Sequence, residues 1–494
     1  MTDRPRRAGR APPRVAPRTA RRPVPGGGRP TAPALPLSDP DDEFGRLLRA
    51  LQDPAPGVRQ TAAVALGLLG DARAGASLAV SLTDPDGAVR AAAAEALGPV
   101  GRGAARPDLE RALADREPVV RAFAARALGR IADPRSAAPL AERRTDPSEP
   151  VRQEVAAALG RLAGPMAFRT LGSMLSDPSE RVRRAAVIAI GRGAAADGLG
   201  PVRRALLDPA RRVRVAAAVV LGRWRDRTSV GPLLELLGRP GTWEKPAVLV
   251  ALGAIGDREA LPSIVSSVDH PARWVRVCAL HALGTMRARD AAPVARSCLG
   301  DTAWSVRGAA AVALGAIGDA SDLRPLLALL DDPHPWPRRG AAYALGELGL
   351  SEAAPRLRES VDDRAADVRL AAVWALGRLG DDGARGPLLR LLRERSGAGA
   401  RPPPAEAMDD GGSLASDAAS RLFDATVQAL GRLGRGDPDP EIAEALRAAR
   451  DALSEEELDR PARLPMPEVA ADPLPTVRTL FDDAMPGSVG GEVE

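Results

Sequence analysis

One pattern constrains this chain more than any other feature: Val-Arg-x-x-Ala-Ala-x-Ala-Leu-Gly, seen most plainly at residues 306–315. Its glycine recurs at a constant spacing of thirty-one positions, at Gly67, Gly98, Gly129, Gly160, Gly191, Gly222, Gly253, Gly284, Gly315, Gly346 and Gly377. A twelfth copy ends at Gly431, whereas the constant spacing would place it at position 408, so this unit contains an insertion. A fixed period of this length predicts a solenoid, in which each short unit packs mainly against its neighbours.

Each unit predicts two helices separated by a break. The first is a short apolar segment such as 324–330, commonly with a proline near its start, where a missing N–H is tolerated. An Asp-Pro break such as Asp53-Pro54 ends it, and the second helix runs from the Val-Arg pair to just past the Leu-Gly pair. Alanines on the second helix permit close packing, and the leucines supply core volume. We therefore predict an all-α solenoid of about 12 units over residues 42–453.

Aspartate and arginine recur six residues apart in nine units, which predicts a charge ladder along the stack. The ladder includes Asp53, Arg59, Asp84, Arg90, Asp146, Arg152, Asp177, Arg183, Asp208, Arg214, Asp301, Arg307, Asp332 and Arg338. We expect each aspartate to cap the second helix and each arginine to bridge its own loop and the next. A register-setting role is favoured over an anion-binding track. Arg239 and Lys245 break the ladder in the seventh unit, and with Pro246 following we expect a kink or widened joint there.

The unit resembles the HEAT repeat through its Asp-Pro, Val-Arg and Ala-Ala-x-Ala-Leu-Gly elements. Its short period is similar to that of the HEAT-like repeats of bilin (phycocyanobilin) lyases. The resemblance implies a right-handed superhelix of helix pairs that acts as a scaffold or adaptor and holds partners along a groove. Since a minority of such proteins are enzymes, a bilin-lyase-like enzyme or enzyme subunit remains an alternative. The His-Glu pairs by which deoxyhypusine hydroxylase binds iron are missing, because none of His270, His281 and His334 precedes glutamate.

Composition separates the two ends from the repeats. Residues 1–41 hold nine arginines and three aspartates among many Pro, Gly and Ala, and residues 454–494 hold ten acidic and three basic residues. We expect a disordered basic tail, a disordered acidic tail and a flexible insertion at about 396–416. A final helix at about 440–453 is expected to cap the stack. With only two cysteines, no signal pattern and no apolar run of membrane-spanning length, we expect a cytoplasmic protein.

The sequence carries no catalytic or cofactor motif that we recognise. The sole lysine precedes Pro246, so it cannot belong to a phosphate-binding Gly-Lys-Ser/Thr loop, and His-Glu-x-x-His is missing. Cys278, His281, His270 and Cys298 are possible zinc ligands by type. Cys278 occupies the alanine packing column and Cys298 an apolar first helix, so packing roles are favoured. We predict no catalytic site, metal site or cofactor.

Two sets of residues are candidates for partner binding. Aromatic residues recur at related positions of the later units: Trp243, Trp274, Trp304, Trp336, Tyr343 and Trp374. Arginines gather in units 3–6: Arg130, Arg161, Arg181, Arg192, Arg203, Arg211 and Arg223. Residues 121–225 carry 20 basic and 9 acidic residues, a net charge of +11, whereas residues 226–394 carry 21 of each.

The aromatic residues predict a protein-binding stripe, although packing between units would also explain them. The arginines predict attraction of an acidic protein partner or of the chain's own acidic tail. Nucleic-acid binding through units 3–6 remains an alternative, because phosphate contacts require little more than dense arginine. We therefore predict a non-catalytic scaffold that binds a protein partner along its concave groove. Its oligomeric state stays open.

Overall fold

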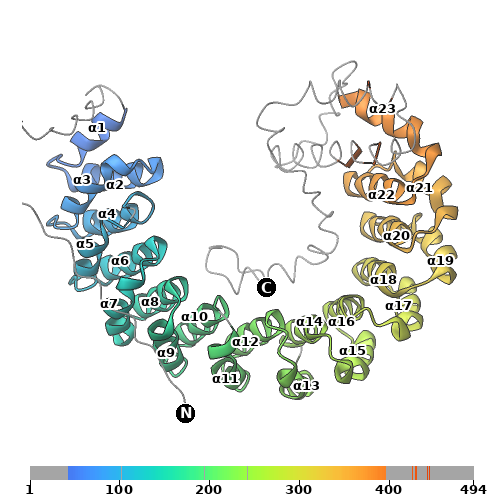
Figure 1. The fold of residues 1–494 in the computed structure, drawn as a ribbon, viewed down its shortest axis with the longest axis horizontal. Coiled ribbons are helices and arrows are strands. Elements are labelled where there is room, and N and C mark those ends of the chain that lie inside the picture. The colour runs from blue at the N-terminus through green and yellow to red at the C-terminus, as the bar shows by residue number, and fades with distance from the viewer. Residues whose placement is uncertain are drawn as a thin grey trace, which may run out of the picture.

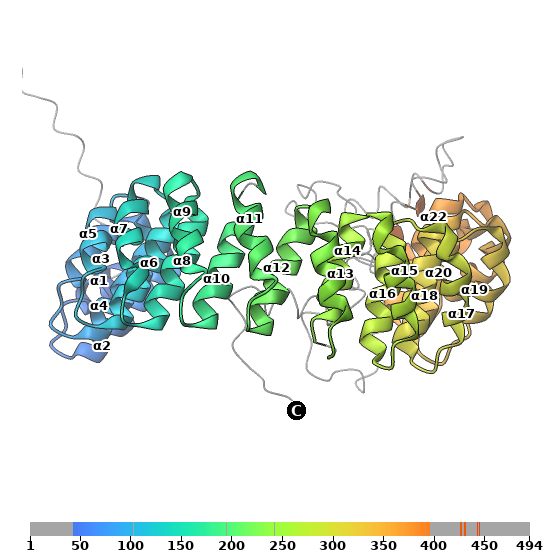
Figure 2. The same cartoon turned by 90° about the horizontal axis from the view of Figure 1, so that it is seen from below.

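The computed structural model describes residues 43–395, except 102, 194 and 242, together with residues 425, 426, 429, 430, 442 and 444. Within these residues, the regular structure consists of α-helices and short 3-10 turns. The helices stack side by side into an open arc (Figure 1). Seen from below, the arc is a band in which the helices stand across the direction of stacking (Figure 2). The predicted all-α solenoid is confirmed. The proposed tails at 1–41 and 454–494 and the insertion at 396–416 lie outside the described residues.

Helices of two kinds alternate along the chain. The first helices are α1 (Glu43–Ala50), α3 (Gly75–Ser81), α5 (Arg106–Ala112), α7 (Ala137–Glu142), α9 (Pro165–Met174), α11 (Ala195–Ala205), α13 (Val230–Gly238), α15 (Leu261–Ser266), α17 (Ala292–Ser297), α19 (Leu323–Leu329), α21 (Ala354–Ser360) and α23 (Arg385–Arg395). The second helices are α2 (Pro56–Leu69), α4 (Gly87–Val100), α6 (Pro118–Ile131), α8 (Glu149–Leu162), α10 (Glu180–Gly191), α12 (Arg211–Arg223), α14 (Lys245–Ile255), α16 (Arg273–Thr285), α18 (Trp304–Ile317), α20 (Pro335–Leu348) and α22 (Ala366–Leu379). The second helices line the inside of the arc and the first helices its outside (Figure 1).

A continuous apolar core runs between the two layers of helices. The leucine before a repeat glycine is fully buried, as Leu66, Leu97 and Leu128 show, and Ile190 takes this place before Gly191. Alanines of the second helices fill the spaces between neighbouring units, and one cluster of buried residues extends from Phe44 to Ile442. Since each unit buries its apolar side chains largely against the next, the core grows with the number of repeats.

The repeat glycines allow successive second helices to touch. A Cβ atom on Gly129 would lie 2.7 Å from the Cα of Ala158. A Cβ atom on Gly253 would lie at the same distance from the Cα of Ala282. Such a contact leaves no room for a side chain, so glycine is needed for packing at a position where the helix itself would favour alanine. The spacing is looser between α16 and α18, where the Cα of Ala313 lies 3.3 Å from a Cβ built on Gly284.

The wider joint expected at Pro246 is not found on the glycine side of the stack. A Cβ atom on Gly222 of α12 would lie 2.7 Å from the Cα of Ala251 in α14, which is as close as elsewhere. The alanine contact is instead replaced one step earlier, where Gly191 of α10 meets the side chain of Val220 in α12. A valine needs more room than an alanine, so the bulky contact lies between α10 and α12.

The twelfth copy of the pattern continues the stack. A Cβ atom on Gly377 would lie 2.9 Å from the Cα of Ala429. Ala429 stands two positions before Gly431, just as Ala158, the partner of Gly129, stands two positions before Gly160. The insertion therefore lengthens this unit without changing which alanine meets the preceding glycine. Beside Ala429, Leu430 is buried as well.

Candidate functional site

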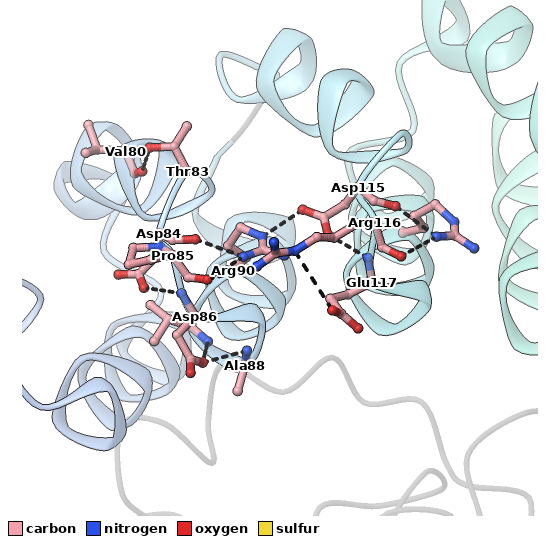
Figure 3. Close-up of polar contacts among 12 residues, drawn as sticks. Val80, Thr83, Asp84, Pro85, Asp86, Ala88, Arg90, Asp115, Arg116 and Glu117 are labelled. Carbon is pink, nitrogen blue, oxygen red and sulfur yellow. Dashed lines mark hydrogen bonds and ion pairs between the residues drawn. The ribbon is translucent and has the colours of Figure 1, made fainter.

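The arginine in the first turn of each second helix joins two loops. Nη1 of Arg90 donates to the carbonyl oxygens of Asp84 and Pro85 in its own loop, at 2.9 and 3.2 Å (Figure 3). Nε and Nη2 donate to the two carboxylate oxygens of Asp115 in the next unit, at 2.7 and 2.9 Å. Asp115 also accepts a bond from the N–H of Glu117, the residue before α6. The sequence predicted that the aspartate caps the first turn of the second helix. The structure shows that it instead fixes the loop residue at which the chain enters this helix.

The same bridge recurs along much of the arc. The pairs, 25 residues apart, are Arg59–Asp84, Arg90–Asp115, Arg121–Asp146, Arg152–Asp177, Arg183–Asp208, Arg276–Asp301, Arg307–Asp332 and Arg338–Asp363. In the first pair, the bond from Arg59 holds the pKa of Asp84 below its usual value, against the opposing effect of burial. All three guanidinium nitrogens are engaged within the protein, which favours a structural role for this column over anion binding.

The ladder is interrupted around α14. Arg214 donates from Nε to Oε1 of Glu244 at 3.0 Å, since Arg239 stands where the aspartate would be. Lys245 turns to the carbonyl oxygen of Leu237, and His270 takes the next aspartate position. Nδ1 of His270 accepts from the N–H of Ala272, so it reproduces the loop bond but not the ion pair. The sequence indicated the break at Arg239 and Lys245, but Glu244 was missed because it lies outside the repeated spacing.

A second column of arginines directly follows the glycines of α6, α8, α10 and α12. Arg130, Arg161 and Arg223 are exposed and Arg192 is half-buried. Desolvation, and then the positive charges of Arg192 and Arg130, lower the pKa of Arg161 despite the nearby Glu154. Within the described part of the chain, these four arginines have no hydrogen-bond or ion-pair partner. We call them the arginine column, and α6–α12 the arginine section.

The remaining predicted arginines lie in different surroundings. Arg203, on the outer helix α11, donates through Nε and Nη2 to both carboxylate oxygens of Asp226, each at 2.6 Å. Arg181 lies 3.7 Å from Glu149 and is exposed. Arg211 packs over the ring of Trp243 at 4.6 Å. The structure therefore does not unite all the predicted arginines in one surface.

Tryptophans gather at the N-terminal ends of the second helices from α14 to α20. Trp304 stacks on the ring of His334 at 3.9 Å and meets Trp336 edge-on at 6.5 Å. The indole of Trp336 covers Gly308, where a Cβ atom would collide with it. Exposure remains considerable, at 66% for Trp243 and 37% for Trp304. We call Trp243, Trp274, Trp304 and Trp336 the tryptophan rim, and α14–α22 the aromatic section.

Tyr343 and Trp374 form a separate pair between α20 and α22. Their rings stack 4.9 Å apart, with an angle of 18° between the planes. Only 8% of Tyr343 and 6% of Trp374 is exposed. Burial, with the negative charge of Glu347 beside it, raises the pKa of Tyr343 to about 12. This pair packs neighbouring units together and offers little surface to a partner.

The two cysteines lie in the packed interior. Both are unpaired and buried, and burial raises the pKa of Cys278 to about 12. His281 is half-buried, and desolvation lowers its pKa. Over the described residues, no group of three or more His, Cys, Asp and Glu side chains is placed to hold a metal ion. None of the helices described here has the length and apolar character required to cross a bilayer.

One exposed apolar area escaped the sequence analysis. On α2, Val64 is 45% exposed, Leu68 84% and Leu69 50%, and Val80 of α3 is 72% exposed. Leu68 follows the glycine of its unit, and is therefore the counterpart of Arg130 two units later. Alignment of the variable positions across all units would have found it, whereas attention to arginine and tryptophan did not.

Comparison with known proteins now defines the class. The sequence profile described as HEAT repeats matches residues 34–98, 76–152, 143–210, 196–277, 261–345 and 323–408. These matches jointly extend over more than half of the chain, and the helix pairs of the arc have the corresponding form. The chain belongs to the HEAT-repeat family. A search among curated proteins returns no significant match.

Solved structures with the same fold include nuclear transport receptors. The Kap95:Nup1 complex has a TM-score of 0.56 at 14% identity, over 83% of this chain and 64% of that chain. Yeast importin-beta (Kap95p) has a TM-score of 0.55 at 14% identity, over 84% and 67%. Kap95p described in connection with RanGDP has a TM-score of 0.51 at 15% identity, over 84% and 70%. At such low identity, these similarities establish the solenoid fold alone.

Proposed function

We propose that this protein is a non-catalytic scaffold that binds a protein partner along the inner face of its arc. The exposure of the tryptophan rim carries the proposal, because Trp243 is 66% and Trp304 37% exposed. Large aromatic side chains supply much of the binding energy at protein interfaces when a partner removes them from water. Their placement at the starts of successive second helices gives a partner several anchors along one edge.

The fold supports such a role. A solenoid contacts itself only between neighbouring units, so small changes at each joint adapt its inner face to a partner. Among solved structures of the same fold, Kap95 is described as a complex with Nup1 and Kap121p as bound to Pho4p. The unpaired state of Cys278 and Cys298 agrees with action in the cytoplasm, which we include in the proposal.

The proposal can be tested by affinity capture from a lysate of the source organism. The full chain is compared with a Trp243→Ala/Trp304→Ala variant and with a Val80→Ala/Leu207→Ala control. Val80 of α3 and Leu207, two residues after the end of α11, are 72% and 67% exposed but lie outside the second helices. We expect wild type and control to recover the same protein, and the tryptophan variant to recover at least tenfold less.

Purified components then establish direct binding. The recovered protein is expressed separately and titrated against each of the three chains, with circular dichroism confirming equal helix content. Equal affinities for wild type and tryptophan variant would refute the role of the tryptophan rim. Conversion of a bound small molecule by the complex would refute the non-catalytic assignment.

A further inference from the structure

The arginine column is exceptional among the equivalent positions of the repeat. The side chains that follow the glycine in successive units lie close enough to interact, because Glu347 and Arg378 occupy these positions on α20 and α22 and lie 3.7 Å apart. On α6, α8, α10 and α12 all four such positions carry arginine. Like charges therefore stand next to one another where the same geometry elsewhere forms an ion pair.

The column faces the inside of the arc. Residues four apart share one face of a helix. The position directly after the glycine therefore lies on the same side as the position three residues before the glycine. First helices cover the outer side of the second helices (Figure 1), and the neighbouring second helices cover the flanks. The inner face remains exposed along the middle of this layer. By the four-residue spacing, the column shares this face with Arg126 of α6 and Ile188 of α10.

We infer that the acidic C-terminal segment, residues 454–494, binds the arginine column and covers the inner face of α6–α12. Its ten acidic and three basic residues give a net charge of −7, opposite to the +11 of residues 121–225. The column lacks acidic partners among the described residues, so the segment would satisfy charges that the repeats leave open. The contact is independent of the proposed partner, although its regulatory consequence rests on the proposed function.

The segment has the length and charge spacing for this contact. Second helices pack about 8–10 Å apart, so the column is at most about 90 Å from the twelfth unit even along the arc. An extended chain covers about 3.3 Å per residue, so residues 454–494 reach about 135 Å. The same rise places about every third residue of the segment opposite a new arginine. Asp472, Asp482, Asp483, Glu492 and Glu494 lie far enough along the segment, at about 60 Å or more of extended chain from residue 454, to reach the column.

Attachment to the same chain makes the contact competitive with an external ligand. A covalent link of this length gives an effective concentration in the millimolar range. A peptide that binds the free column with a dissociation constant near about 100 µM would therefore be weakened about tenfold by the attached segment. A partner whose binding region overlaps the column would have to displace the segment, which makes the segment an internal competitor for the scaffold.

The experiment uses the full chain and a fluorescein-labelled synthetic peptide of residues 454–494, with binding followed by anisotropy at about 50 mM salt, where such contacts are weakly screened. One variant neutralises the part of the segment that can reach the column, with Asp472→Asn, Asp482→Asn, Asp483→Asn and Glu492→Gln. A second adds Arg161→Gln, Arg192→Gln and Arg223→Gln to these changes. A control adds Arg169→Gln, Arg204→Gln and Arg324→Gln instead, which removes equal charge from the outer helices.

We expect the neutralised chain to bind the peptide about tenfold more tightly than wild type does. The arginine-column variant should lose this binding, and the outer-helix control should keep it. Equal binding by wild type and neutralised chain would overturn the internal contact, and failure of both to bind would do the same. Binding of a duplex DNA probe without binding of the peptide would overturn it in favour of a nucleic-acid surface. None of these results depends on the tryptophan rim.

Discussion

The arginine section and the aromatic section share one helical frame but present different surfaces. In both, Asp-Arg bridges join neighbouring loops, as Arg121–Asp146 and Arg307–Asp332 show. The first carries a net charge of +11 over residues 121–225, and the second, with its tryptophans, carries equal numbers of charges over residues 226–394. The frame is fixed by contacts at the loops and between helix flanks. The position after the repeat glycine differs between the sections: it is arginine on α6, α8, α10 and α12, whereas the aromatic section carries Ala254, Thr285, Ala316, Glu347 and Arg378 there.

The boundary between the sections is where the frame itself changes. Glu244 replaces the usual aspartate as the partner of Arg214, and no ion pair connects Lys245 to His270 within the described residues. Helix α14 nevertheless keeps its tight contacts with α12 and α16 through Gly222 and Gly253. The comparison indicates that close helix packing, more than the charge ladder, holds the arc together across this boundary.

The largest effects should come from filling the glycine contacts in either section. Gly160→Val in α8 and Gly253→Val in α14 would each force a side chain against a Cα atom 2.7 Å from the new Cβ. We expect a loss of about 3 kcal/mol in the free energy of unfolding for each, because overpacking moves backbone as well as side chains. Gly284→Val should cost about 1 kcal/mol less, given its looser 3.3 Å contact.

Urea unfolding followed by circular dichroism measures these changes, and helix content at zero urea shows whether each variant folds. Equal losses for Gly160→Val and Gly253→Val would confirm that packing is common to both sections. A much smaller loss in the arginine section would break that comparison, since it would mean that the helices there separate easily.

An intermediate effect is expected on acidification, and it should be larger at Asp226, which follows the arginine section and accepts bonds from Arg203 of α11. Burial by itself raises the pKa of Asp226, but the hydrogen bonds from Arg203, Ser229 and Thr228 outweigh this effect and lower the pKa from 3.8 to about 2. A lowered pKa contributes stability that is present above the unfolded value and is lost as the pH falls toward 2. We expect Asp226→Asn to cost about 2 kcal/mol at pH 6 and almost nothing near pH 2.

The matched change in the aromatic section is Asp381→Asn, because Asp381 accepts from Arg358 but has no hydroxyl partner recorded among the described residues. Thermal unfolding from pH 6 to pH 2 compares the two variants with wild type. A cost at pH 6 no larger for Asp226→Asn than for Asp381→Asn would remove this difference between the two aspartates. A cost that persists at low pH would contradict the assignment to ionisation.

The smallest effect should come from completing the ladder at the boundary. Lys245→Arg with His270→Asp restores the residue types that form a two-bond ion pair elsewhere, such as Arg276–Asp301 with bonds of 2.9 Å. We expect a gain of about 1 kcal/mol for the double variant, which exceeds the summed gains of the two single variants because each single change supplies only one partner of the pair. Hydrogen exchange in α14 and α16 reports the gain locally. No additional protection in the double variant would show that the ladder is dispensable at this joint.

Much of the frame could be predicted because each unit repeats the same local problem. The spacing from Asp84 to Arg90 recurs through the chain, so the loop-bridging role of the arginine could be inferred once and applied many times. The candidate site was less predictable, because Trp304 and Tyr343 are both aromatic residues at repeat positions but differ in exposure. That difference depends on what the next unit places beside them, which no single unit records.

The sequence by itself determined the period, the alternation of two helices and the Asp-Pro breaks, because these follow from backbone chemistry repeated in every unit. Only the tertiary structure decided that Gly129 meets Ala158, that Glu244 completes a bridge and that Tyr343 is buried under Trp374. These contacts join residues from different units. Their outcome depends on the distance and orientation between helices, which packing of the whole stack sets.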